Sequence, residues 1–484
     1  MTMKASKRLV IVLLFLAGGI RGVNGQRLTP LYQFSGTDGL SPAAALVQGS
    51  DGNFYGTTTG VGVVPDVTVL FGENDSAVYG TVFRISLSGV FTNLYLFSGS
   101  DGANPYAALV LGVDGNLYGT TRYGGTNGYG TVFRMSTNGS LTTLYQFGSG
   151  ANDGQNPVAG LVQGSDGNFY GTTGSGGTNG YGTVFRITPS GLLTNLHLFR
   201  FVDGSYPVAG LVQSSDGNFY GTTFYGGTNG AGTVFEITPQ GTLTTLYQFG
   251  GLPTDGLFPA AGLAQDSDGW LYGTTYEGGT NDYGTVFKIS PQGTLSTLYQ
   301  FGGLPTDGIL LVAGLVRGSD GSFYGTTEAG GTNTINCGGG CGTEFRISSA
   351  GTMTVLCQSS GLATDGVSPE AGLVQGSDGC FYGTTYQGGT NGDGTVFKVS
   401  VPLSPPANQI AGFQFVNVFD SAYAAFLISS VAGETYQLQY TDSMNPANWI
   451  NSGGSITSIG GALTTFDLVQ PLTAQRFYRF AITP

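Results

Sequence analysis

Repeated carboxylates are the side chains of this sequence best suited to bind something. Seven Asp-Gly pairs share one sequence context, mostly Asp-Gly-x-x-Pro, at Asp38, Asp101, Asp153, Asp203, Asp255, Asp307 and Asp365. A ring of carboxylate and carbonyl oxygens suits calcium, a hard cation. A simpler interpretation, which we favour, is that each Asp accepts hydrogen bonds from its own loop backbone. We therefore expect no cofactor, with calcium as the one ion to test.

Tyrosines in the glycine-rich segments form a second set of candidate binding residues. The set is Tyr123, Tyr129, Tyr181, Tyr225, Tyr276, Tyr283 and Tyr386, of which we single out Tyr129, Tyr181, Tyr225 and Tyr283. Exposed tyrosines offer flat apolar surface with a polar tip, on which sugars or peptides stack. Buried, the same residues would only fill space between packed sheets, and the sequence favours neither reading.

Catalytic chemistry has little support in the sequence. His197 is the only histidine, and it occupies a position that tyrosine takes in related segments, so a serine or cysteine nucleophile lacks an evident base. Most zinc and iron sites also need histidine. A carboxylate-based hydrolase or lyase would need acidic residues that depart from the repeat, and we identify only Asp66, Glu73, Asp75 and Glu328.

Four cysteines are present, and two of them lie close together in one long loop. We expect a Cys337–Cys341 disulfide, with Cys357 as the competing partner of Cys341 and Cys380 unpaired. Two cysteines without further ligands at the right spacing are weak evidence for a metal.

The segments that position these residues are short strands in a repeated unit. In residues 159–199 we predict four strands, A (Gly160–Gln163), B (Asn168–Thr173), C (Thr183–Thr188) and D (Leu193–Phe199). Each is rich in β-branched or aromatic residues and is bounded by Gly, Pro, Asn or Asp. Asp-Gly between A and B, at Asp51, Asp114, Asp166, Asp216, Asp268, Asp320 and Asp378, is interpreted as turn chemistry.

The unit recurs seven times at about 50 residues, which is typical of a β-propeller. The motif Tyr-Gly-Thr-Thr begins at Tyr55, Tyr118, Tyr170, Tyr220, Tyr272, Tyr324 and Tyr382. The last copy has no D strand, whereas an extra one, Leu28–Phe34, precedes the first copy. We therefore predict a seven-bladed ring, all-β, closed by its N-terminal strand.

Antiparallel strand order predicts which face of the ring carries the variable loops. The A–B and C–D turns share one face and are short, while the B–C and D–A connections share the other. The long insertions 59–80 and 328–342 fall in B–C connections. Loops on a rigid scaffold commonly bind ligands, so we place a binding site on this second face.

The repeat resembles a known family. The segments GSDGNFYGTT, GGTNGYGTVFRITPSG and LTTLYQF are similar to the GloVer tandem repeat of exported bacterial proteins, over about residues 26–400. The resemblance implies a repeat architecture and an exported location, and it implies no activity.

Three further segments complete the expected organisation. Residues 1–25 read as a signal peptide, with Lys4, Lys7 and Arg8 before an apolar run. Residues 401–410 are a Pro-rich linker, and residues 411–484 hold six strand candidates, which suggests a small β-sandwich similar to fibronectin type III modules. No later segment is apolar and long enough to span a membrane.

A net charge of −13 opposes binding to nucleic acid or anionic lipid, because both require a cationic surface. We expect a secreted or cell-surface monomer that binds a polysaccharide or a cell-surface protein without catalysis. The alternative is a carboxylate-dependent hydrolase or lyase that acts on an extracellular polymer.

Overall fold

The computed structural model describes residues 28–400, apart from 61–78, 253, 305, 334–336, 338 and 362–365, and the strand residues between 410 and 483. These described residues contain no helix, and thus none that could cross a membrane. The chain forms two compact units, Met1–Val401 and Pro402–Pro484. The predicted signal peptide, the insertion residues Asp66, Glu73 and Asp75, and Asp365 lie outside the described residues.

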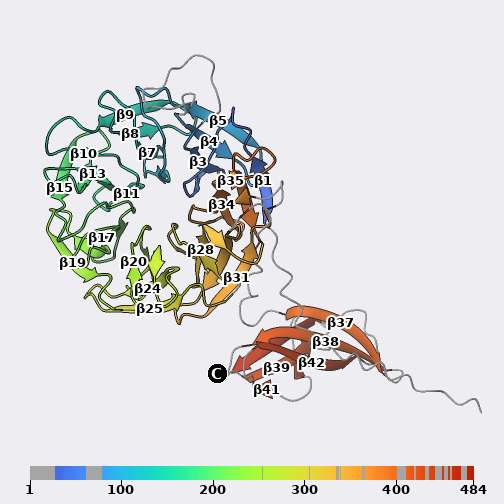
Figure 1. Ribbon diagram of the computed structural model, residues 1–484. Coiled ribbons are helices and arrows are strands. Elements are labelled where there is room, and N and C mark those ends of the chain that lie inside the picture. The colour runs from blue at the N-terminus through green and yellow to red at the C-terminus, as the bar shows by residue number, and fades with distance from the viewer. Residues whose placement is uncertain are drawn as a thin grey trace, which may run out of the picture. The chain divides into compact units, whose positions relative to one another are not determined.

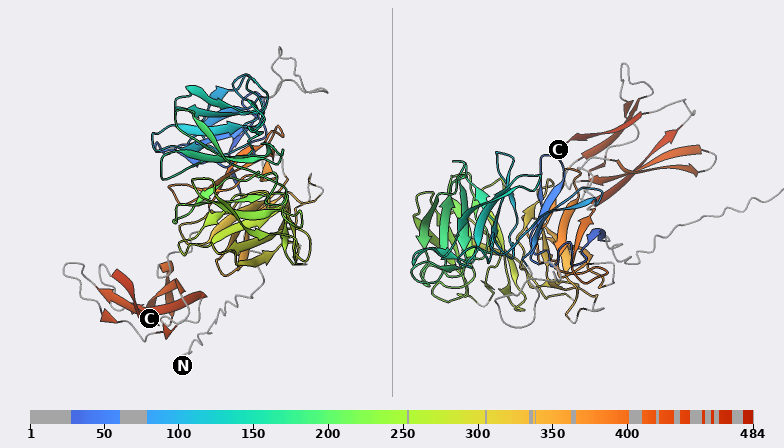
Figure 2. Two further views of the ribbon diagram at one scale, coloured as in Figure 1. Left: turned by 90° about the vertical axis from the view of Figure 1, so that its left-hand side faces the viewer. Right: turned by 90° about the horizontal axis from the view of Figure 1, so that it is seen from above.

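Seven four-stranded antiparallel sheets, the blades, are arranged in a ring (Figure 1; seen from the side in Figure 2). The A strands are β2 (Val47–Gln48), β6 (Val110–Leu111), β11 (Val162–Gln163), β16 (Val212–Gln213), β21 (Ala264–Gln265), β27 (Val316–Arg317) and β33 (Val374–Gln375). The B strands are β3 (Phe54–Thr58), β7 (Leu117–Thr121), β12 (Phe169–Thr173), β17 (Phe219–Thr223), β22 (Leu271–Thr275), β28 (Phe323–Thr327) and β34 (Phe381–Thr385).

The C and D strands complete each blade. The C strands are β4 (Thr81–Ile85), β8 (Thr131–Met135), β14 (Thr183–Ile187), β18 (Thr233–Ile237), β24 (Thr285–Ile289), β30 (Thr343–Ile347) and β36 (Thr395–Val399). The D strands are β5 (Phe91–Leu96), β9 (Leu141–Gln146), β15 (Leu193–Leu198), β19 (Leu243–Gln248), β25 (Leu295–Gln300), β31 (Met353–Gln358) and, in the last blade, β1 (Thr29–Gln33). The A strands are shorter than predicted, with two residues each.

The Tyr and the two Thr of Tyr-Gly-Thr-Thr make three different hydrogen bonds. In the third blade, the Tyr170 hydroxyl donates to Asp166 Oδ2 at 2.9 Å, and Asp166 also accepts from the backbone N of Asn168 at 3.1 Å. Thr172 donates to the carbonyl of Ala209 in the next blade at 3.2 Å, and Thr173 contacts the Thr183 hydroxyl at 2.9 Å. The Asp of the A–B turn is therefore structural, as predicted.

The core lies between adjacent blades. In one cluster, Tyr170, Val184 and Phe199 of the third blade pack on Phe219 and Phe235 of the fourth, and all are buried. Aromatic pairs across the interface have ring centroids about 4 Å apart, as for Tyr170 and Phe219 at 4.0 Å. Burial of such large apolar side chains is the main stabilising contribution.

Contacts of the same kind join the two ends of the repeat region. Strand β1 pairs antiparallel with β36 and lies beside the last blade in Figure 1. Phe34, at the end of β1, is fully buried with Tyr382 of the last blade against Phe54 and Phe83 of the first. Thr384 donates to the carbonyl of Ala44 at 3.1 Å, which repeats the inter-blade bond of Thr172.

Small two-stranded sheets join the D–A and B–C connections of four blades, and the sequence did not predict them. The pairs are β10 (Gly154–Gln155) with β13 (Ser175–Gly176), β20 (Gly256–Leu257) with β23 (Glu277–Gly278), β26 (Gly308–Ile309) with β29 (Ala329–Gly330), and β32 (Gly366–Val367) with β35 (Gln387–Gly388). These pairings place both kinds of connection on one face of the ring, as predicted. We call it the loop face.

The second unit contains two antiparallel sheets. One has the order β37 (Ile410–Val418), β38 (Ser421–Ser430), β42 (Gly461–Val469). The other is centred on β39 (Thr435–Thr441), which pairs with β40 (Ile450–Asn451), β41 (Ile456–Thr457) and β43 (Phe477–Thr483). Strands β40 and β41 are the shortest of this unit, with two residues each.

Phe34→Ala tests whether β1 is a true part of the ring. Phe34 and Phe199 occupy equivalent positions at an inter-blade core, so Phe199→Ala is the matched control. Each truncation should lower the free energy of unfolding by about 3–5 kcal/mol, as expected for a buried Phe. Urea unfolding compares the two variants. A Phe34→Ala variant as stable as the wild type, beside a destabilised Phe199→Ala, would contradict closure by β1.

Candidate functional site

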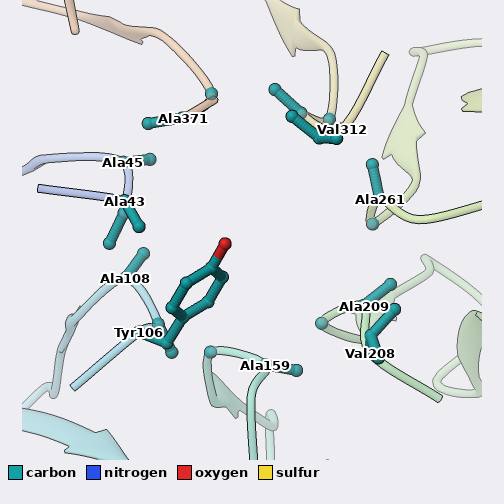
Figure 3. A pocket seen from close by; sticks show the side chains of 18 of the residues that line it. Ala43, Ala45, Tyr106, Ala108, Ala159, Val208, Ala209, Ala261, Val312 and Ala371 are labelled. Atoms are coloured by element: carbon teal, nitrogen blue, oxygen red, sulfur yellow. The ribbon is translucent and has the colours of Figure 1, made fainter. Parts of the chain in front are cut away.

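A cavity of about 180 Å³ is lined by one short segment from each of the seven blades (Figure 3). These segments directly precede the A strands, so the cavity opens among the D–A connections. Most of the lining residues are Ala, Gly or Val, and the two exceptions with large polar side chains are Tyr106 and Glu370. Figure 3 shows the Tyr106 ring pointing from the wall toward the centre of the cavity.

Tyr106 and Glu370 meet although they come from the second and the seventh blade. The Tyr106 hydroxyl donates to Glu370 Oε2 at 3.4 Å. Burial and the charge of Glu328 together raise the pKa of Glu370 to about 7, while the Tyr106 hydrogen bond opposes this rise. Burial also raises the pKa of Glu328. The described residues include no salt bridge to either carboxylate.

Two rings of non-repeating residues surround the mouth of this cavity. The first follows each Tyr-Gly-Thr-Thr motif and consists of Thr59, Arg122, Gly174, Phe224, Tyr276, Glu328 and Tyr386. The second lies two positions before each cavity-lining segment and consists of Ser41, Asn104, Asn156, Tyr206, Phe258, Leu310 and Ser368. In every blade the backbone N of the first-ring residue donates to the carbonyl of the second-ring residue, as from Phe224 to Tyr206 at 3.1 Å.

All seven second-ring residues have a positive φ, between 53° and 61°, although none is glycine. This left-handed conformation is unfavourable for ordinary residues and persists only where the surrounding structure holds it. Here the first-ring hydrogen bond holds it. The backbone of both residues of each pair is therefore held at the mouth, where the blades differ in sequence.

Four aromatic residues of these rings and the neighbouring Tyr225 gather on the fourth and fifth blades. We call this group, Tyr206, Phe224, Tyr225, Phe258 and Tyr276, the mouth cluster. Phe224 is at its centre: its ring centroid is 4.7 Å from that of Tyr225, 5.3 Å from Phe258 and 6.3 Å from Tyr276. Its members are half-buried, apart from the exposed Tyr225, and the charge of Glu328 contributes to the raised pKa of Tyr276. The mouth cluster and the two glutamates thus adjoin.

The structure places the predicted loop aspartates in turn-stabilising positions. Asp255 accepts hydrogen bonds from the Tyr247 hydroxyl at 3.1 Å and from the backbone N of Gly250 at 3.0 Å. Asp101, Asp153 and Asp307 likewise accept from the tyrosine of their preceding D strand, and Asp203 contacts His197 Nε2 at 3.3 Å. Among described residues no group of three potential metal ligands occurs. A ligand role for these aspartates, and for calcium, stays a prediction.

Of the four predicted tyrosines, only Tyr225 belongs to the mouth cluster. All four are between 37% and 44% exposed, so they offer ring surface to solvent. Tyr181 lies 5.7 Å from the ring of Phe201, a residue of a D–A connection. Tyr129 and Tyr283 lean on Gly148 and Gly302 of the D–A connections.

Tyr106, Arg122, Phe224 and Glu370 were not predicted from the sequence, whereas Tyr225, Tyr276, Tyr386 and Glu328 were named as loop-face residues. The signal that could have found them is simple. Positions that change from blade to blade, directly after Tyr-Gly-Thr-Thr and around the Pro of Asp-Gly-x-x-Pro, are flanked by positions that hardly change.

A disulfide joins Cys337 and Cys341, whose Cα atoms are 5.3 Å apart. Cys357 is a buried free thiol, and burial raises its pKa. Cys380 is a half-buried free thiol.

Glu370→Gln should change how the stability depends on pH. The unfolded carboxyl loses its proton near its ordinary pKa of 4.5, whereas the folded one holds it to about 7, so this group lowers stability as pH rises between these values. Glu370→Gln has no ionisable group at this position, so it should not lose stability in this pH range. Its melting temperature should exceed that of the wild type by about 2 °C or more at about pH 8, but not at about pH 4. Equal differences at both pH values would contradict the assignment.

Comparison with solved structures finds distant likeness at the level of the fold. The BP39L lectin from Burkholderia pseudomallei aligns with 10% identity and a TM-score of 0.46, covering 87% of this chain and 100% of the lectin. The periplasmic gluconolactonase PpgL of Pseudomonas aeruginosa aligns with 14% identity and a TM-score of 0.43, covering 81% and 95%. No curated protein matches the chain.

A family model identifies the repeat itself. The model described as the Gloeobacter/Verrucomicrobia repeat matches residues 66–267 and 253–442, which together span most of the chain. The structure explains this match, because the motifs that define each unit are the residues that build and join the blades. The chain belongs to the Gloeobacter/Verrucomicrobia repeat family and is a seven-bladed β-propeller.

Proposed function

We propose that this protein is an exported, non-catalytic binding protein that holds a polysaccharide at the mouth of the propeller. The observation that carries the proposal is the mouth cluster. Its aromatic side chains are brought together by two backbone positions that vary among the blades, beside a cavity with polar residues. Aromatic surface beside a few fixed polar groups is the usual composition of a small-ligand site.

The polar groups of the mouth suit a sugar chain better than a folded protein partner. Hydroxyl-rich ligands need hydrogen-bond donors and acceptors at fixed positions beside a stacking surface. Asn104 and Asn156, whose side-chain amides are held by the Thr59 carbonyl at 2.8 Å and the Arg122 carbonyl at 3.1 Å, line the same mouth. A protein partner would be expected to use a larger, flatter area of the loop face.

We also propose the remaining organisation of the chain. Residues 1–25 act as the export signal, and residues 26–400 form the propeller closed by β1. Residues 401–410 are the linker to a β-sandwich of fibronectin type III type, formed by residues 411–484. The basic and apolar start of the sequence supports export. The two antiparallel sheets of the second unit support a sandwich.

A second function, a carboxylate-dependent hydrolase or lyase, is favoured by one observation. Glu370, with a pKa of about 7, lies near Glu328, and a general acid or base works best with a pKa near the working pH. If the protein is such an enzyme, it should depolymerise an extracellular polysaccharide, and Glu370→Gln should abolish that turnover. Binding without release of reducing or unsaturated ends would leave the binding function as the better description.

Phe224→Ala and Tyr276→Ala test the binding function. Loss of one stacking ring should weaken binding of a recognised oligosaccharide about tenfold, which corresponds to ~1.4 kcal/mol. Leu192→Ala is the control, because Leu192 is 70% exposed in a C–D turn on the opposite face. A glycan array finds the oligosaccharide and titration calorimetry measures its affinity. Unchanged affinity in both aromatic variants, or equal loss in Leu192→Ala, would contradict a site at the mouth.

A further inference from the structure

The carboxylates at the mouth have no compensating cation among the contacts that the described residues make. Burial and Glu328 are the causes that raise the pKa of Glu370, and no cation opposes them. Arg122 is the nearby base of the first ring, but its guanidinium lies over the Tyr123 ring, 5.0 Å from the centroid, and its charge acts on Tyr106. Half-buried carboxylates that no cation contacts favour a positively charged partner.

Aromatic rings adjoin the same carboxylates. Tyr276 of the mouth cluster is close enough to Glu328 and Glu370 for both charges to raise its pKa. Tyr106 contacts Glu370 directly. Burial raises the pKa of Tyr106, and Glu370 and Tyr386 add to this rise. Aromatic faces beside carboxylates attract a cationic group through the ring quadrupole and through charge together.

We propose that the mouth selects a polysaccharide whose sugar residues carry a protonated amino group, with Glu370 and Glu328 as the residues that recognise that group. This inference rests on the proposed function, because it names the class of the glycan held at the same site. The sugar rings stack on the mouth cluster, and one ammonium group reaches the cavity where Tyr106 orients the Glu370 carboxylate. A neutral sugar of the same shape satisfies the stacking surface but leaves the two carboxylates uncompensated.

Binding of the cation has a proton signature. Near neutral pH the free protein holds Glu370 partly protonated, and an ammonium ion beside it stabilises the carboxylate. Ligand binding therefore releases a fraction of a proton from Glu370. The charge of Glu328 acts on Glu370 and that of Glu370 on Tyr276, while Tyr106 contacts Glu370 directly. The charges of Tyr386 and Arg122 act on Tyr106.

The test compares two probes with the same backbone, a glucosamine hexamer and an N-acetylglucosamine hexamer, by calorimetry near pH 6 in two buffers of different ionisation enthalpy. We expect the amine probe to bind the wild type about tenfold more tightly than the acetylated probe, which corresponds to ~1.4 kcal/mol. We also expect proton release with the amine probe alone. Glu370→Gln should abolish the proton release and most of the preference, with affinity for the acetylated probe retained.

Glu328→Gln is the second variant, and circular dichroism checks that both fold. Glu328→Gln should reduce the preference for the amine probe without abolishing proton release. Equal binding of the two probes to the wild type would overturn the amine assignment and leave the proposed function standing. Binding of neither probe, with another glycan bound at the mouth, would also overturn it. An amine preference that survives in both variants would place recognition elsewhere, whereas absence of any glycan binding would contradict the proposed function itself.

Discussion

The interface between adjacent blades is the constraint on which the rest of the structure depends. A blade of four short strands cannot bury both of its faces alone, so its aromatic residues pack on the next blade. The first Thr of Tyr-Gly-Thr-Thr donates one hydrogen bond to the backbone of the next blade. The Phe that follows six of the seven D strands, such as Phe199, is buried in the same interface. One open interface would expose one such core, which is why the ends of the repeat region are joined.

A regular ring leaves most residues no freedom to take on a separate function. The Tyr of the motif bonds to the A–B turn and the second Thr to the neighbouring C strand. Loop aspartates such as Asp153 and Asp255 accept from D-strand tyrosines, and Asp203 contacts His197. The residues left free to vary are those at the mouth. They gather there because every blade directs the same two backbone positions to the ring axis, and seven blades bring seven different pairs together.

The sequence was sufficient to predict an all-β, seven-bladed ring because the repeat is nearly exact. Seven copies of each strand, with one D strand displaced to Leu28–Phe34, determine both the number of blades and the face that carries the loops. The site was harder to predict for a physical reason. Tyr106 and Glu370 are more than half of the chain apart and meet only because the ring closes. The left-handed backbone of Tyr206 and Phe258, each directly before a Pro, has no obvious sequence signature either.

If repeat-breaking side chains converge on the ring axis to hold a glycan, a crystal structure of the protein with a bound oligosaccharide should show where. We expect a sugar ring stacked on the mouth cluster, within hydrogen-bond distance of Glu370 or Tyr106. A sugar bound on the face of the A–B and C–D turns, or on the outer D strands with the mouth empty, would contradict it.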